Sequence, residues 1–256
     1  MQAKLSRIIA SEEQINLVKD KHPVLILGFL GSGLVGDIVA SEVIEQLDMV
    51  QIGYIITEDL PPIAVFHEGV LKHAFRLYYC GEKNVIVALC EIPFNQSSTY
   101  SDLARLITDW AIKIDMDEIC VIQGLGEQGF PEEHPIYVAA EKEVIDRIME
   151  VGGMEVLPKG LIMGPEAAVL NEGLNNQLNC YALLTPVNAQ LPNPGAAAEI
   201  VDILNKIYNF GLDSTKLREE AEEITKKLME LNQKTEQQHN KMLSMQQGSP
   251  GSNMYL

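Results

Sequence analysis

Residues 24–36 read VLILGFLGSGLVG. The first six form a continuous apolar run, and Gly31, Gly33 and Gly36 follow within seven positions. Apolar side chains then recur at helical spacing from Ile38 to Leu47. An apolar run that ends in a glycine turn and leads into such a periodic segment is typical of a buried strand followed by a helix. This stretch therefore predicts a strand, a tight turn and a helix.

The rest of the first 212 residues repeats this alternation. Strands are expected at residues 49–56, 64–66, 74–79, 84–90, 118–122, 160–163 and 180–184, and helices at 100–112, 143–149, 167–178 and 196–208. Apolar strands that alternate with helices are typical of a sheet covered on both faces. We expect one α/β body over residues 1–212, built on a doubly wound, mainly parallel sheet.

The composition changes after the body. Uncharged positions alternate at spacings of four and three among polar neighbours, at Leu217, Ala221, Ile224, Leu228, Leu231, Thr235, Gln238, Met242 and Met245. This heptad pattern predicts a coiled-coil-type helix over residues 213–245, with Leu217, Ile224, Leu228 and Leu231 as oligomerisation residues. The alternative is a helix that folds back on its own body, although a globular surface usually demands a wider apolar face.

Residues 246–256 are expected to form a flexible tether with a docking motif at its end. The last three residues are Met254, Tyr255 and Leu256, which supply an apolar stem, a ring with a hydroxyl and a terminal carboxylate. Frayed termini are common, so the three residues alone are weak evidence. A tether on an oligomer-forming helix makes them a candidate partner-binding motif, because several copies would act together.

The charge of the chain is concentrated in its body. Asp and Glu total 36 against 19 Lys and Arg, a formal charge of −17, whereas residues 216–241 carry equal numbers of each sign. An acidic body repels phosphate backbones and attracts partners with basic patches. We therefore expect no nucleic acid partner, although the acidic charge could equally serve solubility.

Other features point to a cytoplasmic protein without a metal site. The sequence holds no apolar run of membrane-spanning length, and it opens on polar sequence rather than on a signal peptide, so we expect no membrane association. Cys80, Cys90, Cys120 and Cys180 lack a CxxC spacing and are expected to be buried thiols in a reducing compartment. The histidines are scattered without ligand spacing, so we expect no zinc.

Candidate chemistry is sparse along the chain. Gly31, Gly33 and Gly36 match the dinucleotide fingerprint, with Glu58 or Asp59 near the place of a ribose-binding acid. The same glycines would serve a tight turn and close helix packing, and their neighbours are apolar. A nucleotide- or nucleoside-binding enzyme or sensor that uses this loop is thus the weaker alternative.

Two further loops carry polar groups. Glu91, Asn95, Gln96, Ser97 and Ser98 follow a predicted strand and could bind a ligand, but neither His nor Lys stands near to activate a serine. A second loop holds Glu127, Glu132, Glu133 and His134, which could serve acid–base chemistry or a weak metal site, although a solvated acidic loop is favoured. We therefore expect no catalytic residues, no cofactor and no enzyme activity.

Several stretches together carry a resemblance to a known family. They are residues 28–36 (GFLGSGLVG), 59–64 (DLPPIA), Gly69 and 191–198 (LPNPGAAA). In them the chain resembles the proteasome assembly chaperone family, and especially its archaeal-type members, over most of residues 5–208. The resemblance implies a nucleoside-phosphorylase-like α/β fold and a non-catalytic homo-oligomer, with a tetramer favoured over a pentamer.

The same resemblance implies a partner. Members of the family are thought to insert a hydrophobic-Tyr-any tail between α-subunits of the 20S proteasome, and so to help its assembly or open its gate without ATP. In this chain Met254 would fill an apolar pocket, Tyr255 would pack and hydrogen-bond, and the carboxylate of Leu256 would pair with a basic residue. A plain oligomeric scaffold with an incidental tail remains the third possibility.

Overall fold

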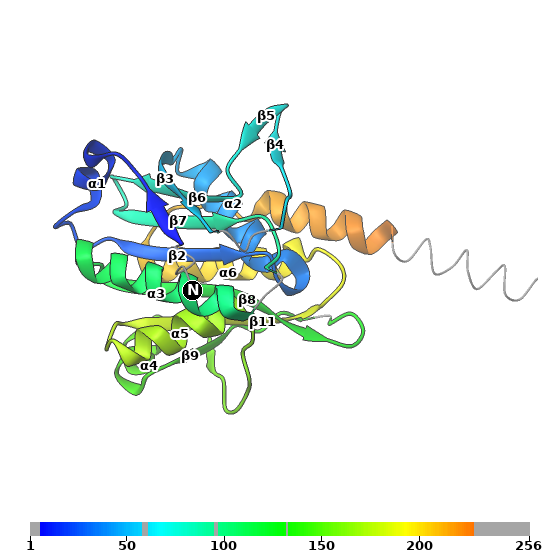
Figure 1. The fold of residues 1–256 in the computed structure, drawn as a ribbon. Helices are drawn as coiled ribbons and strands as arrows, with labels where there is room; N and C mark the ends of the chain where they lie inside the picture. The colour runs from blue at the N-terminus through cyan, green and yellow to red at the C-terminus, as the bar shows by residue number, and fades with distance from the viewer. Residues whose placement is uncertain (1–5, 58–60, 95–96, 132, 228–256) are drawn as a thin grey trace, which may run out of the picture.

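The computed structural model describes residues 6–57, 61–94, 97–131 and 133–227. A nine-stranded sheet runs through them in the order β1-β3-β6-β7-β2-β8-β11-β9-β10 (Figure 1). Its strands are β1 (Arg7–Ile9), β2 (Val24–Phe29), β3 (Val50–Ile56), β6 (Phe75–Cys80), β7 (Val85–Cys90), β8 (Glu118–Glu127), β9 (Tyr137–Ala140), β10 (Glu155–Val156) and β11 (Cys180–Asn188). A separate hairpin pairs β4 (Val65–His67) with β5 (Val70–Lys72). The helices are α1 (Glu12–Val18), the 3-10 turn η1 (Ser32–Leu34), α2 (Val35–Gln46), α3 (Ser97–Ile114), α4 (Lys142–Met149), α5 (Pro165–Asn175) and α6 (Pro194–Tyr208).

The sheet is mixed, so the prediction of a mainly parallel sheet was wrong. The central strands β7, β2, β8 and β11 are parallel neighbours, whereas β1, β3, β6 and β7 pair antiparallel and β9 runs antiparallel to β11. The physical reason lies in the connections. Only residues 81–84 join β6 to β7, and so short a link cannot cross over a sheet, so it forces a hairpin.

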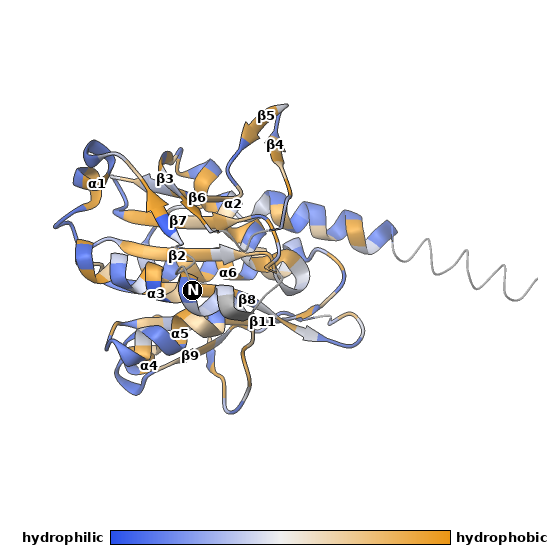
Figure 2. Cartoon of the chain, in the orientation of Figure 1, coloured by the Kyte–Doolittle hydropathy of each residue, from blue (hydrophilic) through white to orange (hydrophobic). Residues whose placement is uncertain are grey.

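Both faces of the sheet are covered, as a doubly wound fold requires. Side chains from β2 enter two separate cores, with Ile26 in one and Leu25 and Leu27 in the other. Helices α2, α4 and α6 contribute to the first core, and α3 and α5 to the second. Figure 2 shows the apolar residues gathered in the strands and on the inward faces of the helices. The expected strand at residues 160–163 is instead a loop that leaves Leu161 91% exposed.

The cysteines are free thiols, and Cys90, Cys120 and Cys180 are buried while Cys80 is half-buried. Burial raises the pKa of the Cys90 thiol to about 12, which makes it a poor nucleophile. None of the helices in the described ranges combines the length and the apolar character needed to cross a bilayer.

A further helix follows the body. The chain turns at Asn209 and Gly211, both in the left-handed region, and is helical from residue 215 to residue 227, where the described part ends. Figure 1 shows this segment, in orange, leaving the body at one side. It lies within residues 213–245, where a coiled-coil-type helix is expected, and the coiled-coil character stays a prediction. Residues 228–245, the tether and the terminal motif lie outside the described residues.

Candidate functional site

The chain is clamped to the body just before the C-terminal helix. The side-chain amide of Asn205 donates to the carbonyl of Leu212 at 2.7 Å and accepts from its N–H at 2.8 Å. Gln46, at the end of α2, does the same for Asp213, at 2.8 and 2.7 Å. Each amide thus satisfies both backbone groups of one residue, as a neighbouring strand would. We call the contacts of residues 212–218 with α2 and α6 the helix seat.

Polar contacts continue into the first turn of the helix. The Ser214 hydroxyl donates to Asp202 on α6 at 2.7 Å, and Arg218 donates to Glu199 at 2.6 Å and to Asp202 at 2.5 Å. Hydrogen bonds from Thr215 lower the pKa of the Asp213 carboxyl. Since the charged groups here are partly exposed, each pair contributes little stability, but together they fix the direction of the helix.

Apolar packing supplies the stability of the helix seat. Leu217 is 2% exposed and belongs to the same core as Phe210 and Leu212. The first position of the heptad pattern therefore packs in the core of its own body. Ile224 is half-buried and lines a pocket of about 110 Å³ beside Pro192. The oligomerisation role stays a prediction for Ile224, and Leu228 and Leu231 lie outside the described residues.

Replacing Leu217 with Ala is expected to loosen the helix seat. The change removes a buried side chain at the junction and leaves a cavity, which should lower the free energy of unfolding by about 2–4 kcal/mol. Hydrogen exchange of the amides over residues 215–227 should become much faster at the same time. The control is Glu219→Ala, since Glu219 is exposed in the same turn. Slow exchange in the Leu217 variant would mean that the seat does not depend on this side chain.

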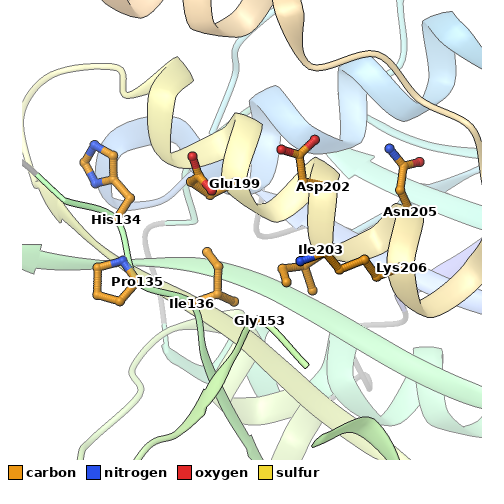
Figure 3. A pocket seen from close by; sticks show the side chains of 9 residues that line it. All are labelled: His134, Pro135, Ile136, Gly153, Glu199, Asp202, Ile203, Asn205 and Lys206. Atoms are coloured by element: carbon orange, nitrogen blue, oxygen red, sulfur yellow. The ribbon is translucent and has the colours of Figure 1, made fainter. Parts of the chain in front are cut away.

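A larger pocket of about 430 Å³ adjoins the helix seat. Figure 3 shows α6 on one side, with Glu199, Asp202 and Lys206, and residues 134–136 on the other. Both carboxylates are engaged by Arg218. The Nδ1 of His134 lies 3.0 Å from the Pro186 carbonyl, which can only accept, so the ring donates there. The two carboxylates and the imidazole of this pocket are therefore already paired or hydrogen-bonded. The pocket borders the helix seat and does not gather these groups for a reaction.

The acidic loop does not assemble a reactive centre. Glu127 and Glu133 are exposed, His134 is half-buried, and Glu132 lies outside the described residues. Within the described ranges, His, Cys, Asp and Glu side chains do not gather in threes at a spacing that would hold a metal ion. The arrangement favours the solvated acidic loop over acid–base chemistry.

Two of the three fingerprint glycines serve packing. A Cβ on Gly36 would lie 2.8 Å from the Ile122 carbonyl oxygen and 3.0 Å from that of Phe29. Gly33 has a φ of 66°, and a Cβ there would meet Val187 at 2.9 Å. At Gly31 the nearest atom would be a Glu166 carboxylate oxygen at 3.6 Å. The glycines let α2 approach the strands, which is the packing interpretation.

Carboxyl groups surround this turn, where a phosphate would need donors. Asp37 lies in the first turn of α2, and burial, followed by the nearby Glu91, raises its pKa to about 6. Burial likewise raises the pKa of Glu166 to about 7. Both groups are therefore largely ionised in mildly alkaline solution, and they would repel an anion. Glu58 and Asp59, the candidate ribose ligands, lie outside the described residues.

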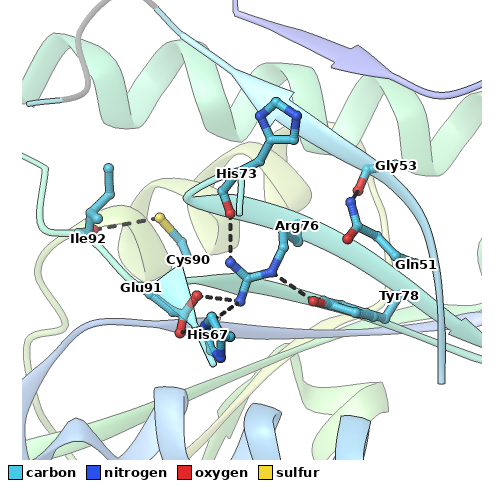
Figure 4. A network of polar contacts seen from close by, with 9 residues as sticks. All are labelled: Gln51, Gly53, His67, His73, Arg76, Tyr78, Cys90, Glu91 and Ile92. Carbon is cyan, nitrogen blue, oxygen red and sulfur yellow. Dashed lines mark hydrogen bonds and ion pairs between the residues drawn. The ribbon is translucent and has the colours of Figure 1, made fainter. Parts of the chain in front are cut away.

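An ion-pair network lies at the carboxyl end of β7, beside β6 (Figure 4). Arg76, on β6, is 2% exposed and bonds to Glu91, to the Tyr78 hydroxyl at 2.7 Å and to the His73 carbonyl at 2.6 Å. His67 bonds to the other oxygen of Glu91 at 2.8 Å. Both carboxylate oxygens of Glu91 are thus bonded within the protein, which favours a structural role over ligand binding. Asn95 and Gln96 lie outside the described residues, as do the side chains of Ser97 and Ser98.

The buried carboxyl of Glu166 predicts a pH dependence of stability. The folded state holds the proton up to a pKa of about 7 against 4.5 for an ordinary Glu, so stability falls as the pH rises between these values. Glu166→Gln should remove that loss. The variant should gain at most roughly 3–4 kcal/mol over the natural chain above pH 8, and little near pH 4.5.

Denaturant unfolding at several pH values measures this difference. The control is Glu143→Gln, because Glu143 is exposed on α4. A gain that does not change between pH 4.5 and pH 8 would contradict the titration of Glu166 and leave only a packing effect.

Comparison with known proteins places this architecture among solved relatives. The model of the PAC2 family matches residues 25–232. An uncharacterised protein of Methanocaldococcus jannaschii is 25% identical over 230 residues, which cover 89% of this chain and 91% of that protein.

Solved structures agree with this match. The crystal structure of Pyrococcus furiosus PbaA, described as an archaeal homolog of proteasome-assembly chaperone, is 26% identical with a TM-score of 0.79, over 94% of this chain and 98% of that one. Pyrococcus furiosus PbaB, described as an archaeal proteasome activator, has the same fold at 19% identity and a TM-score of 0.78, over 90% and 99% of the two chains.

Proposed function

Because this chain belongs to the PAC2 family, we propose that it is a non-catalytic, homo-oligomeric chaperone or activator of the 20S proteasome that works without ATP. PbaA, similar to this chain over nearly its whole length, is described as a homolog of a proteasome-assembly chaperone, and PbaB as a proteasome activator. The partners in this proposal are the α-subunits of the 20S particle and further copies of the chain.

The observation that carries the proposal furthest is the helix seat. Asn205 and Gln46 clamp residues 212 and 213, and Leu217 locks the first turn, so the helix starts from a fixed position on the body. The helix over residues 215–227 therefore starts from a rigid base. A rigid base reduces the conformational freedom that must be lost on docking.

The docking contacts follow from the chemistry of the last three residues. Met254 would fill the apolar part of a pocket between α-subunits, and Tyr255 would pack there and hydrogen-bond through its hydroxyl. The carboxylate of Leu256 would pair with a basic side chain of the partner. The net charge of −17 would speed the approach to a surface with such basic groups.

An oligomer that carries several weakly binding tails would bind more tightly than one tail does. Tails that share one oligomer reach effective concentrations in the millimolar range for each other's sites. A homo-oligomer, with a tetramer favoured over a pentamer, would thus bind well even if each tail binds poorly. In this proposal Ile224, Leu228 and Leu231 form contacts between copies along the helix.

The turn at Gly31, Gly33 and Gly36 supports a non-catalytic role. Gly36 is used by the packing of α2 on the sheet and Gly33 by the contact of the turn with Val187, and the carboxyl groups of Asp37 and Glu166 lie near. The experiment that tests the proposal is a pull-down of 20S particles with the full chain and with a chain that ends at Asn253. We expect the full chain to bind the 20S particles and the chain that ends at Asn253 not to bind them.

A further inference from the structure

The pocket beside the helix seat has the size of a small-molecule site. It holds about 430 Å³, and ligand pockets commonly measure roughly 300–1,000 Å³. Ile136 and Ile203 supply apolar lining, and Glu199, Asp202 and Lys206 supply charged groups around it (Figure 3). The pocket therefore combines room for a ligand with groups that recognise charge.

Two charged groups of the pocket keep a free position for a bond. Arg218 donates to Oε1 of Glu199, and among the described residues none donates to the other oxygen, Oε2. Within the same ranges the Lys206 amine takes part in neither an ion pair nor a hydrogen bond, although it lines the pocket. The pocket thus offers one acceptor of negative charge and one donor of positive charge.

A glycine makes room for the lysine. A Cβ on Gly153 would lie 2.6 Å from Nζ of Lys206 and 3.3 Å from Cδ1 of Ile203, so both atoms lie beside this glycine. Figure 3 shows the Lys206 side chain running back along α6, with its amine beside Ile203. A larger residue at position 153 would displace the amine from this place.

The spacing of the two free groups sets the length of a ligand. Ile203 lies four residues after Glu199 on α6, so the amine beside Ile203 and the Glu199 carboxylate are about 6 Å apart along the helix axis. An extended chain advances about 3.3–3.6 Å per residue, so two residues span about 7 Å. The charged ends of a dipeptide match this separation, whereas those of a single amino acid are too close together.

The charges around the pocket are balanced. The carboxylates of Glu199 and Asp202 both pair with the guanidinium of Arg218, and the Lys206 amine supplies the second positive charge. A ligand with a net charge would leave one charge without a counterpart, which is unfavourable where water is partly excluded. A ligand with one charge of each sign keeps the balance.

We propose that this pocket binds a short peptide with free ends, of the length of a dipeptide. Its carboxylate pairs with the Lys206 amine, and its ammonium donates to Oε2 of Glu199. The ligand shares the Glu199 carboxylate with Arg218 and so lies at the base of the C-terminal helix. This inference goes beyond the proposed function, since it concerns a small-molecule site and does not depend on docking to the proteasome.

Titration calorimetry of the full chain with the dipeptide alanyl-alanine tests the site. We expect saturable binding at one site per chain. Two modified dipeptides separate the two ends, because N-acetyl-alanyl-alanine lacks the ammonium and alanyl-alanine amide lacks the carboxylate. Each should bind about 10-fold or more weakly, since each loses one charged hydrogen bond.

A variant of the lysine locates the carboxylate end. Lys206→Met removes the amine and keeps the apolar stem, so it should weaken the binding of alanyl-alanine about 10-fold. The same change should cost no further affinity for the amide, which has no carboxylate for the lysine to hold. The control is Lys113→Met, because Lys113 is exposed on α3, which packs on the other face of the sheet.

Three results would overturn the proposal. They are a natural chain without saturable binding of alanyl-alanine, equal affinities for the three dipeptides, and a Lys206→Met chain that binds alanyl-alanine as tightly as the Lys113→Met control. No proteasome is present in these titrations, so their outcome is separate from that of the proposed function.

Discussion

Gly36→Ala is expected to lower the free energy of unfolding by about 3 kcal/mol, and Gly31→Ala to change it by less than about 0.5 kcal/mol. The new methyl on residue 36 would press on the carbonyl oxygens of Ile122 and Phe29, at 2.8 and 3.0 Å. Both belong to central strands and cannot move aside without disturbing the sheet. At residue 31 the nearest atom is 3.6 Å away, which is ordinary contact.

Denaturant unfolding of the two variants decides between packing and ligand binding. Since Ala is the better helix former, the clash at residue 36 must exceed a gain of about 1 kcal/mol to appear. The large loss at Gly36 alone would support the packing role. If Gly36→Ala were as stable as the natural chain, close helix packing would not explain the glycines. Nucleotide binding at the turn would then be the favoured explanation.

Deleting Met254, Tyr255 and Leu256 is expected to abolish co-purification with 20S particles. The deletion removes the apolar stem, the ring and the terminal carboxylate from every copy at once. Because binding through several tails multiplies weak affinities, the loss should exceed 100-fold in apparent affinity. The body and the helix seat are untouched, so oligomer mass and melting temperature should remain those of the full chain.

The deletion has a matched control in the tether. Removing three residues from the Gly/Ser segment, Gly248, Ser249 and Pro250, shortens the chain equally but keeps the terminal motif. That variant should still co-purify with the particles. If it behaves like the terminal deletion, tail length rather than the docking motif explains the result.

The central part of the fold could be predicted because its strands are buried on both faces. The run at residues 24–29 is β2, and the periodic segment after the glycines is α2. Such strands show no alternation with polar residues, so they stand out in the sequence. The direction of a strand leaves no such pattern in the sequence, so the antiparallel pairs of this sheet were not predicted. The short turn at residues 81–84 could have revealed the β6–β7 hairpin.

The helix seat could not be predicted from the sequence. Gln46 and Asp213 are 167 residues apart, and an amide at a helix end looks like any surface residue. Leu217 fits the heptad pattern equally well whether it faces its own body or a partner, because both environments are apolar. The sequence alone therefore left these alternatives open.

The sequence could have indicated that Arg76 is a buried charge with a partner. It stands inside the strand run FRLYYC, where a charged side chain is rarely buried unless it is paired. Its partners, Glu91 and His67, follow from the β6–β7 hairpin and from strand β4, whose positions depend on the tertiary fold. A charged residue in an apolar strand therefore indicates that a polar network exists, but it does not identify the partner residues.

Docking of the C-terminal tail is tested most directly by a binding titration on immobilised 20S particles. The full chain and the chain ending at Asn253 are compared, with and without millimolar free peptide of residues 246–256. We predict saturable binding of the full chain, its displacement by the peptide, and no binding of the shortened chain. Equal binding of both chains, unaffected by the peptide, would contradict the proposed function.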